Sequence, residues 1–255
     1  MFFLTIPVTT VNIELIKSEL RISCPHVKSS HRCEGVARGL GYRTYAALLA
    51  DAKSIHPNAA IVNEGQFVAY LGEQGFGVEA LSLYRAVGLA AFRAALEMEP
   101  ILTQNGMGIP QGLRDINGVK ETISDRRAVF EKDRAEFQKS KSLDPFLLSL
   151  SLVQRIEKTR TMRNLSSYGL KHLAENSHFL TPEGIHVPAT YVSNGTFIAA
   201  AIYAGFSYKP PISGYIQSSL NLYFNMSKKS IILLENEFRP RGASAQYRQR
   251  KRDKG

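Results

Sequence analysis

Two pairs of zinc-binding residue types lie close together near the start of the chain. Cys24 and His26 are followed by His31 and Cys33. All four are common zinc ligands. If Ser30 caps a helix, however, His31 and Cys33 lie about 200° apart around its axis and cannot grip one ion together. We therefore expect a histidine near a helix start, a Cys33 side chain that faces the core, and no metal.

A second group of reactive side chains lies further along the chain. His172 and Glu175 are three residues apart, on one face of a predicted helix, and no third metal ligand is evident. This spacing predicts a carboxylate–histidine hydrogen bond. The chain also lacks a nucleophile elbow, a phosphate-binding glycine loop and a paired-carboxylate site. The sequence therefore favours a non-catalytic protein without a cofactor, and it leaves open a metal-dependent hydrolase.

The region around these residues carries an excess of positive charge. Between Arg155 and Lys171 only Glu157 is acidic. Helix starts near Ser166 and Ser193 would offer backbone N–H groups to phosphates, and the basic side chains would add charge. The alternative is a solvated face over an ordinary helical core. The candidate nucleic-acid contacts here are Arg155, Lys158, Arg160, Arg163, Ser167, Lys171 and Asn194.

The last seventeen residues, 239–255, form the most basic block of the chain. They carry seven Lys or Arg against one Asp, which is six of the ten net positive charges. Burying an unpaired charge costs on the order of several kcal/mol, so we expect a disordered tail that stays in water. It either contacts a phosphate backbone or only keeps the protein soluble. Its candidate contacts are Arg239, Arg241, Arg248, Arg250, Lys251 and Arg252.

The elements that must position these residues are mostly helices. Three Gly-aromatic pairs, Gly41-Tyr42, Gly75-Phe76 and Gly205-Phe206, each end a predicted helix. Helices are expected over about 31–40, 45–52, 66–74, 79–99, 119–141, 146–156, 168–176 and 195–205, a Gly-rich loop over 101–118, and candidate strands over 186–192, 220–226 and 231–234. The fold class is mainly α, with helical bundle-like halves and room for a small β element near the C-terminus.

The helix pair over 34–52 has the skeleton of a helix-turn-helix, with Ala37 four residues before Gly41. A second helix that reads DNA needs polar or basic side chains on its exposed face. Residues 45–50 read Tyr-Ala-Ala-Leu-Leu-Ala instead. This composition favours burial, or docking on another protein.

A long charged helix is expected over 119–141. Ile116, Ile123, Phe130 and Phe137 recur every seven residues and give it one narrow apolar seam. The helix then either lies across its own domain or pairs with itself in a homodimer.

The length of 255 residues is enough to bury roughly 70–75% of the unfolded surface without disulfides. We expect a helical N-terminal domain (1–110), a long charged connector (111–142), a basic helical C-terminal domain (143–238) and the basic tail (239–255). The apolar stretches fall short of the ~20 residues that a membrane span requires, and the start lacks a basic n-region. We therefore expect a soluble cytoplasmic protein that does not enter a membrane.

Two segments resemble motifs in uncharacterised proteins of proteobacterial plasmids and integrative elements. The first is a Ser-His…Leu-Gly-aromatic pattern within 29–49. The second and more specific one joins Ser167-Tyr-Gly-Leu-Lys-His-Leu-Ala-Glu175 to Tyr191-Val-Ser-Asn-Gly-Thr-Phe-Ile-Ala-Ala-Ala201. The resemblance implies a mobile-element setting and brings no catalytic residue.

These observations favour a non-catalytic nucleic-acid-binding protein, with DNA as the expected partner, in the maintenance or regulation of a mobile element. The tail and residues 155–171 would neutralise phosphates, while the helix starts at Ser167 and Asn194 would fix orientation. The alternative is an accessory or inhibitor protein that binds a host protein or nucleoprotein complex, through the apolar face of 45–50 or the seam of 116–137.

Overall fold

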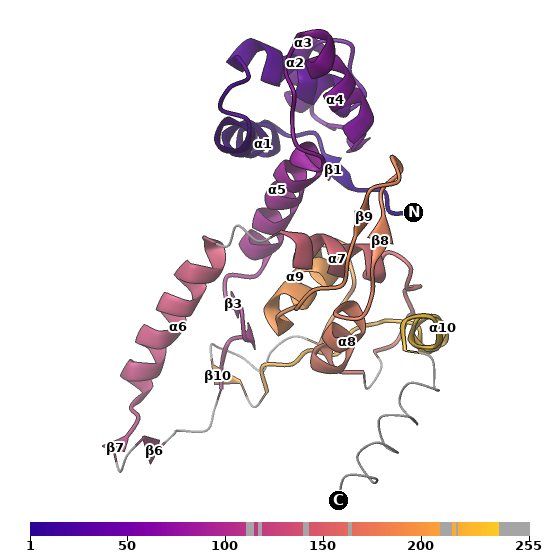
Figure 1. Ribbon diagram of the computed structural model, residues 1–255. Coiled ribbons are helices and arrows are strands. Elements are labelled where there is room, and N and C mark those ends of the chain that lie inside the picture. The colour runs from indigo at the N-terminus through magenta and orange to yellow at the C-terminus, as the bar shows by residue number, and fades with distance from the viewer. Residues whose placement is uncertain are drawn as a thin grey trace, which may run out of the picture. The chain divides into compact units, whose positions relative to one another are not determined.

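The computed structural model describes residues 1–110, 115–116, 119–139, 143–162, 165–209, 216–217 and 219–239 (Figure 1). The chain forms two compact units. The first holds Met1–Ala94 and Phe179–Val187, and the second holds Ala95–His178 and the described residues from Pro188 onward. Ten helices and a few short two-stranded sheets make up the described part of the chain, which confirms the mainly α fold.

The first unit is a small helical body with two short sheets. Its elements are β1 (Thr5–Pro7), α1 (Thr10–Ser23), α2 (Ser29–Gly39), α3 (Tyr45–Ala52), β2 (Ala59–Ile61), α4 (Glu64–Glu73), most of α5 (Ser82–Met98), β8 (Phe179–Leu180) and β9 (His186–Val187). β1 pairs antiparallel with β2, and β8 with β9. Helices α2 and α4 pack closely because Gly35 has no side chain: a Cβ there would lie 3.2 Å from the Phe67 ring.

Gly-aromatic pairs end three helices, as the sequence predicts. At the end of α2, Gly41 has φ of +85°, and the Tyr42 N–H donates to the Ala37 carbonyl at 2.8 Å. Gly75 and Gly205 have φ of +80° and +75° and are followed by the same bond from the next residue. Only glycine adopts this backbone without strain, which is why the sequence alone predicts these helix ends.

The second unit contains the remaining elements: β3 (Leu102–Thr103), β4 (Gly106–Met107), β5 (Ile109–Pro110), β6 (Asp115–Ile116), β7 (Val119–Lys120), α6 (Ile123–Gln138), α7 (Asp144–Val153), α8 (Ser167–Ala174), α9 (Asn194–Tyr203), β10 (Ile216–Gln217) and α10 (Lys228–Phe238). β5 and β10 pair in parallel, and the other pairs are antiparallel. The core lies between α7 and α9, which are buried along almost their whole length.

Helix α6 is the long charged helix that the sequence predicts, but the residues along its buried face differ from the expected apolar seam. Thr122 caps it in a capping box with Asp125. Phe130 and Phe137 are buried, but Ile123 is exposed, and the side chain of Ile116 lies outside the described residues. Arg134 completes the buried row instead. Its guanidinium donates to the carbonyls of Leu96 and Leu102, both at 2.5 Å.

Two expectations about local structure are wrong. Residues 231–234 are not a strand, because they lie inside α10, where Ser227 caps the helix and Ile231 and Leu234 share its buried face. Residues 101–118 are more than a loop, because β3 and β4 form a tight hairpin that turns at Gln104 and Asn105, with Gly106 at φ of +133° directly after the turn. Residues 223–226 form an extended segment with isolated β-bridges to Lys158, Ser166 and Tyr208.

No helix of the described chain has the length and apolarity needed to span a bilayer.

Candidate functional site

A pocket of about 360 Å³ opens in the second unit. Helix α8, the start of α9 and the turn between β3 and β4 form its wall. It is lined by Gln104, Asn105, Tyr168, Lys171, His172, Glu175, Tyr191 and Asn194. Two of the side chains that the sequence singled out as nucleic-acid contacts, Lys171 and Asn194, therefore meet in one pocket, together with the His172 and Glu175 pair. We call it the Lys171 pocket.

Lys171 is the central charge of this pocket. Its side chain is buried, and its Nζ donates to Glu175 Oε1 at 2.8 Å and to the Val192 carbonyl at 3.3 Å. The ammonium also lies 5.1 Å from the ring centroids of both Tyr168 and Tyr191. A buried ammonium requires such partners, because an uncompensated charge is costly away from water.

Glu175 holds the polar side chains of the pocket together. Its Oε1 accepts from Lys171 and from the Val192 N–H, and its Oε2 lies 2.6 Å from His172 Nδ1. Burial raises the pKa of this carboxyl, but the hydrogen bonds from Lys171 and His172 outweigh burial and leave the pKa below its ordinary value. Glu175 is therefore ionised at neutral pH and fixes the His172 proton on Nδ1.

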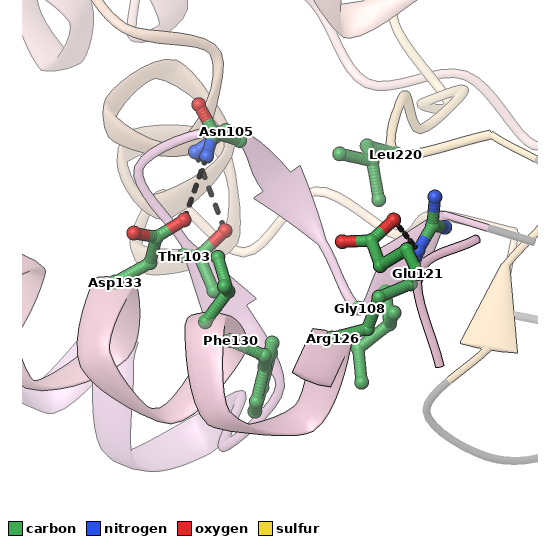
Figure 2. A pocket seen from close by; sticks show the side chains of 10 residues that line it. Thr103, Asn105, Gly108, Glu121, Arg126, Phe130, Asp133 and Leu220 are labelled. Carbon is green, nitrogen blue, oxygen red and sulfur yellow. Dashed lines mark hydrogen bonds and ion pairs between the residues drawn. The ribbon is translucent and has the colours of Figure 1, made fainter. Parts of the chain in front are cut away.

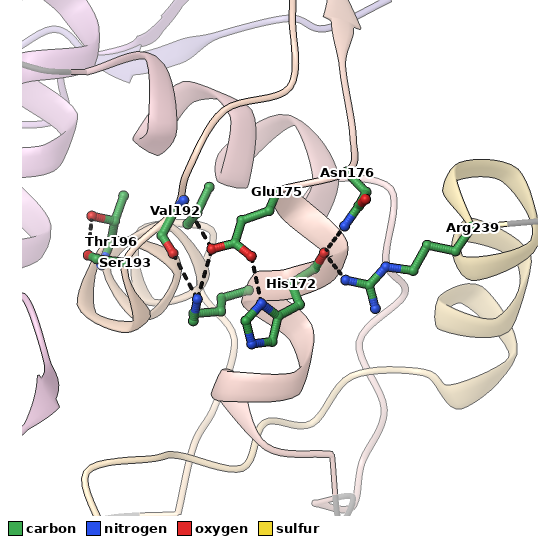
Figure 3. A network of polar contacts seen from close by, with 8 residues as sticks. His172, Glu175, Asn176, Val192, Ser193, Thr196 and Arg239 are labelled. Carbon is green, nitrogen blue, oxygen red and sulfur yellow. Dashed lines mark hydrogen bonds and ion pairs between the residues drawn. The ribbon is translucent and has the colours of Figure 1, made fainter. Parts of the chain in front are cut away.

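The backbone around His172 is anchored from two sides. Its carbonyl accepts hydrogen bonds from Asn176 Nδ2 at 2.6 Å and from the Arg239 guanidinium at the end of α10 (Figure 3). Its ring lies edge-on to Tyr168, with centroids 4.8 Å apart. Arg239, predicted as a nucleic-acid contact, is therefore also a structural link between α10 and α8.

The start of α9 is clamped by the turn between β3 and β4. The Gly195 N–H donates to the Gln104 carbonyl at 3.0 Å, and Asn194 Nδ2 donates to the Asn105 carbonyl and to Asn221 Oδ1, both at 3.1 Å. A Cβ on Gly195 would lie 1.9 Å from the Thr103 carbonyl oxygen. Asn194 Oδ1 is buried and has no hydrogen-bond donor among the described residues.

The structure uses several expected phosphate donors internally. Ser167 is fully buried: its N–H donates to the Leu222 carbonyl at 2.8 Å, and its Oγ accepts from the Leu222 N–H at 3.1 Å. At the start of α9 the backbone N–H of Gly195 likewise donates to a carbonyl of the chain, that of Gln104. These two helix starts therefore bind neighbouring segments of the chain, which the sequence pattern could not reveal.

The remaining predicted contacts fall into two groups. Arg155 forms a two-point ion pair with Glu237, at 3.0 and 2.5 Å, although half of its side chain remains in water. Lys158 and Arg160 are exposed, with the Lys158 ammonium 5.4 Å from the centroid of the Phe206 ring. Arg163, Arg241, Arg248, Arg250, Lys251 and Arg252 lie outside the described residues.

A second pocket of the same unit, about 440 Å³, lies along α6 (Figure 2). Its charged groups are Arg126, which pairs with Glu121 at 2.6 Å, and Asp133, which accepts from Asn105 Nδ2 at 3.0 Å. Two acids against one base in its lining disfavour a polyanion. Asn105 lines both pockets and connects α6, through Asp133, to α9, through Asn194.

The sequence did not single out four residues of this pocket: Gln104, Asn105, Tyr168 and Tyr191. Tyr168 could have been found, because it shares a helix face with Lys171, His172 and Glu175 at spacings of three and four residues. Tyr191 carried no such signal, because only the fold brings it to α8. Tyr168 and Tyr191 are 52% and 67% exposed.

The Cys-His cluster of the first unit is spread over separate contacts. Cys24 is buried, whereas Cys33, expected to face the core, is only half-buried. His26 Nε2 lies 2.7 Å from the Gly77 carbonyl, and His31 packs near Tyr70. Among the described residues no three His, Cys, Asp or Glu side chains are grouped to hold a metal ion.

Searches against protein-family models, curated proteins and solved structures find no match for this chain.

Proposed function

We propose that the second unit binds single-stranded nucleic acid at the Lys171 pocket, as part of the maintenance or regulation of a mobile element. One observation carries the proposal: Tyr168 and Tyr191, both more than half exposed, lie on the rim of a pocket with a cation 5.1 Å from each ring centroid. Exposed aromatic rings next to basic side chains are the usual surface for unpaired bases, because every base has a face that can stack.

Charge supports the same conclusion. The chain carries ten net positive charges, and Lys158, Arg160 and Lys209 are exposed in the second unit. Such charges attract a phosphate backbone through release of its counterions, whatever the base sequence. The rings add what charge alone does not provide, a preference for strands whose bases are unpaired. In a duplex the bases already stack on one another and cannot reach Tyr168 and Tyr191.

The test is fluorescence anisotropy with a labelled 15-nucleotide DNA strand, the same sequence as RNA, and the matching duplex. We expect both single strands to bind more tightly than the duplex. Tyr168→Ala and Tyr191→Ala are each expected to weaken single-strand binding by about 5- to 150-fold, since stacking contributes about 1–3 kcal/mol per base. Duplex binding should change little.

Phe3→Ala is the control. Phe3 is an exposed aromatic residue of the first unit, 48% accessible, and its removal should leave binding unchanged. Equal binding of strand and duplex, insensitive to both tyrosine substitutions, would contradict the proposal. Absence of binding to all three probes would favour the alternative, a protein partner, for which helix α3 offers exposed Ala46, Ala47 and Ala50.

A further inference from the structure

The geometry points to separate binding places for the base and the phosphates of a strand. The Lys171 pocket takes one unpaired base, and exposed lysines and arginines outside the pocket hold the phosphates. This inference rests on the proposed function and names the part of the ligand that the pocket binds. It differs from the interpretation of Lys171 as a phosphate contact. Charge, shape and the position of the exposed cations each contribute to it.

The charge in the pocket does not suit a phosphate. The ammonium of Lys171 and the carboxylate of Glu175 are 2.8 Å apart, and both side chains are largely buried. These two charges sum to zero. A phosphate beside Lys171 would also face the Glu175 carboxylate, so repulsion would offset attraction while the anion lost its hydration. An uncharged base meets no such penalty.

The shape of the pocket suits a flat and mainly apolar group. Its volume of about 360 Å³ is near the lower limit for small-molecule sites, which favours one base over a larger ligand. Lys171 lies 5.1 Å from the centroids of both tyrosine rings, and the large exposure of these rings leaves surface on which a base can stack. Gln104 is exposed on the rim, where its amide can donate to and accept from the edge of a base.

Two exposed lysines, Lys158 and Lys209, lie on segments that connect by backbone pairing to the start of α8 at the pocket. The backbone of Lys158 forms an isolated β-bridge with Met226, and the Lys209 backbone N–H donates to the Tyr223 carbonyl. Tyr223 in turn forms an isolated β-bridge with Ser166, the N-cap residue of α8. Lys158 and Lys209 therefore lie on segments that pair with the extended segment 223–226, which itself pairs with the start of α8. A strand with one base in the pocket has cations for its phosphates along this path.

The experiment separates base from phosphate with short synthetic DNA. A labelled pentanucleotide in which all five positions are abasic is compared with one that carries a single adenine at its centre, and with the normal pentanucleotide. All three have the same phosphates. We expect the single adenine to raise affinity at least about five-fold over the abasic strand. The slope of log Kd against log salt should be equal for both, because it counts phosphates only.

Two further results decide the inference. In the Tyr168→Ala/Tyr191→Ala variant the gain from the single adenine should vanish, while the abasic strand binds as before. Equal affinity of the abasic and single-adenine strands for the unmodified protein would overturn the inference, provided that the normal pentanucleotide binds. Failure of the normal pentanucleotide and of the longer single strands to bind would instead remove the proposed function itself.

Discussion

At the residue scale, the pairing of Lys171 with Glu175 decides what this part of the chain can bind. By sequence, Lys171 is one of several cations in a basic stretch, free to meet a phosphate. In the structure it is buried and its charge is offset by the carboxylate of Glu175, the C-cap residue of the same helix, four residues later. Such a pair stabilises the fold only while both partners remain, because removal of one leaves a buried charge alone.

Glu175→Gln is therefore expected to lower the free energy of unfolding by about 3 kcal/mol. Adding Lys171→Met should recover part of this loss, because the two groups are coupled. The measurement is urea denaturation of the wild-type protein, both single variants and the double variant. Strictly additive losses would show that the pair is not a unit.

The pH dependence of this effect has a defined sign. The folded pKa of Glu175 is below the ordinary value of 4.5, so its contribution to stability is fully present above pH 4.5 and is lost as pH falls through the folded value. The difference in stability between wild type and Glu175→Gln should shrink in that acid range. A difference that stays constant down to about pH 3 would contradict this assignment.

Glu64, buried at the start of α4, gives the opposite pH dependence. Burial raises the pKa of its carboxyl to about 7, although the backbone N–H groups of Tyr84 and Leu83 donate to it at 2.9 and 3.2 Å. Between pH 4.5 and 7 the folded protein keeps a proton that the unfolded chain has released. The free energy of unfolding therefore falls as pH rises, by about 3 kcal/mol in total.

Urea denaturation on both sides of this range and within it, at about pH 4.5, 6 and 7.5, tests this prediction. Glu64→Gln cannot ionise, so the variant should lose this fall and become more stable relative to wild type as pH increases. Glu73→Gln alters an exposed glutamate on the same helix and serves as the control with the wild-type profile. Parallel profiles for wild type and Glu64→Gln would show that Glu64 titrates normally.

At the scale of elements, the site depends on close packing of α9 against the hairpin of β3 and β4. Gly195 permits this approach because a side chain there would occupy the position of the Thr103 carbonyl. The hairpin then supplies Gln104 and Asn105 to the pocket, and Asn105 reaches α6 through Asp133. One glycine thus positions two residues of the pocket wall.

Gly195→Ala is expected to destabilise the protein by about 2–4 kcal/mol, since a Cβ 1.9 Å from a backbone oxygen forces the hairpin to move. Gly72→Ala is the matched control, because Gly72 is also helical and a Cβ there meets nothing within 4 Å. It should stabilise the protein by about 0.5–1 kcal/mol. Thermal unfolding of both variants checks the pair, and a tolerated Gly195→Ala would show that the hairpin moves freely.

At the scale of the whole molecule, net charge and the aromatic site contribute different terms to binding. Residues 240–255 hold six Lys or Arg and one Asp, which is half of the net charge of +10. Charge of this kind sets how steeply affinity depends on salt, whatever the strand. The tyrosines contribute the preference for unpaired bases.

A chain that ends after Arg239 tests this separation, and it keeps the contact between Arg239 and the His172 carbonyl. We expect weaker binding to every probe and a shallower salt slope, with the preference for single strands retained. The comparison uses anisotropy across a salt series. If binding disappears altogether, the basic segment alone accounts for it and the pocket plays no part.

The sequence by itself determined the mainly α fold, the helix stops at Gly41, Gly75 and Gly205, the long helix α6 and the positive charge. These depend on local backbone geometry, periodicity and composition, which short segments specify on their own. Tertiary structure decided the rest. It turned residues 231–234 into part of α10, because Ser227 caps that helix and the unit buries one of its faces. It brought Tyr191 to Lys171, and it occupied the backbone and hydroxyl of Ser167 with Leu222. Contacts between distant segments decide whether a polar group faces solvent or the chain itself, and no local pattern records them.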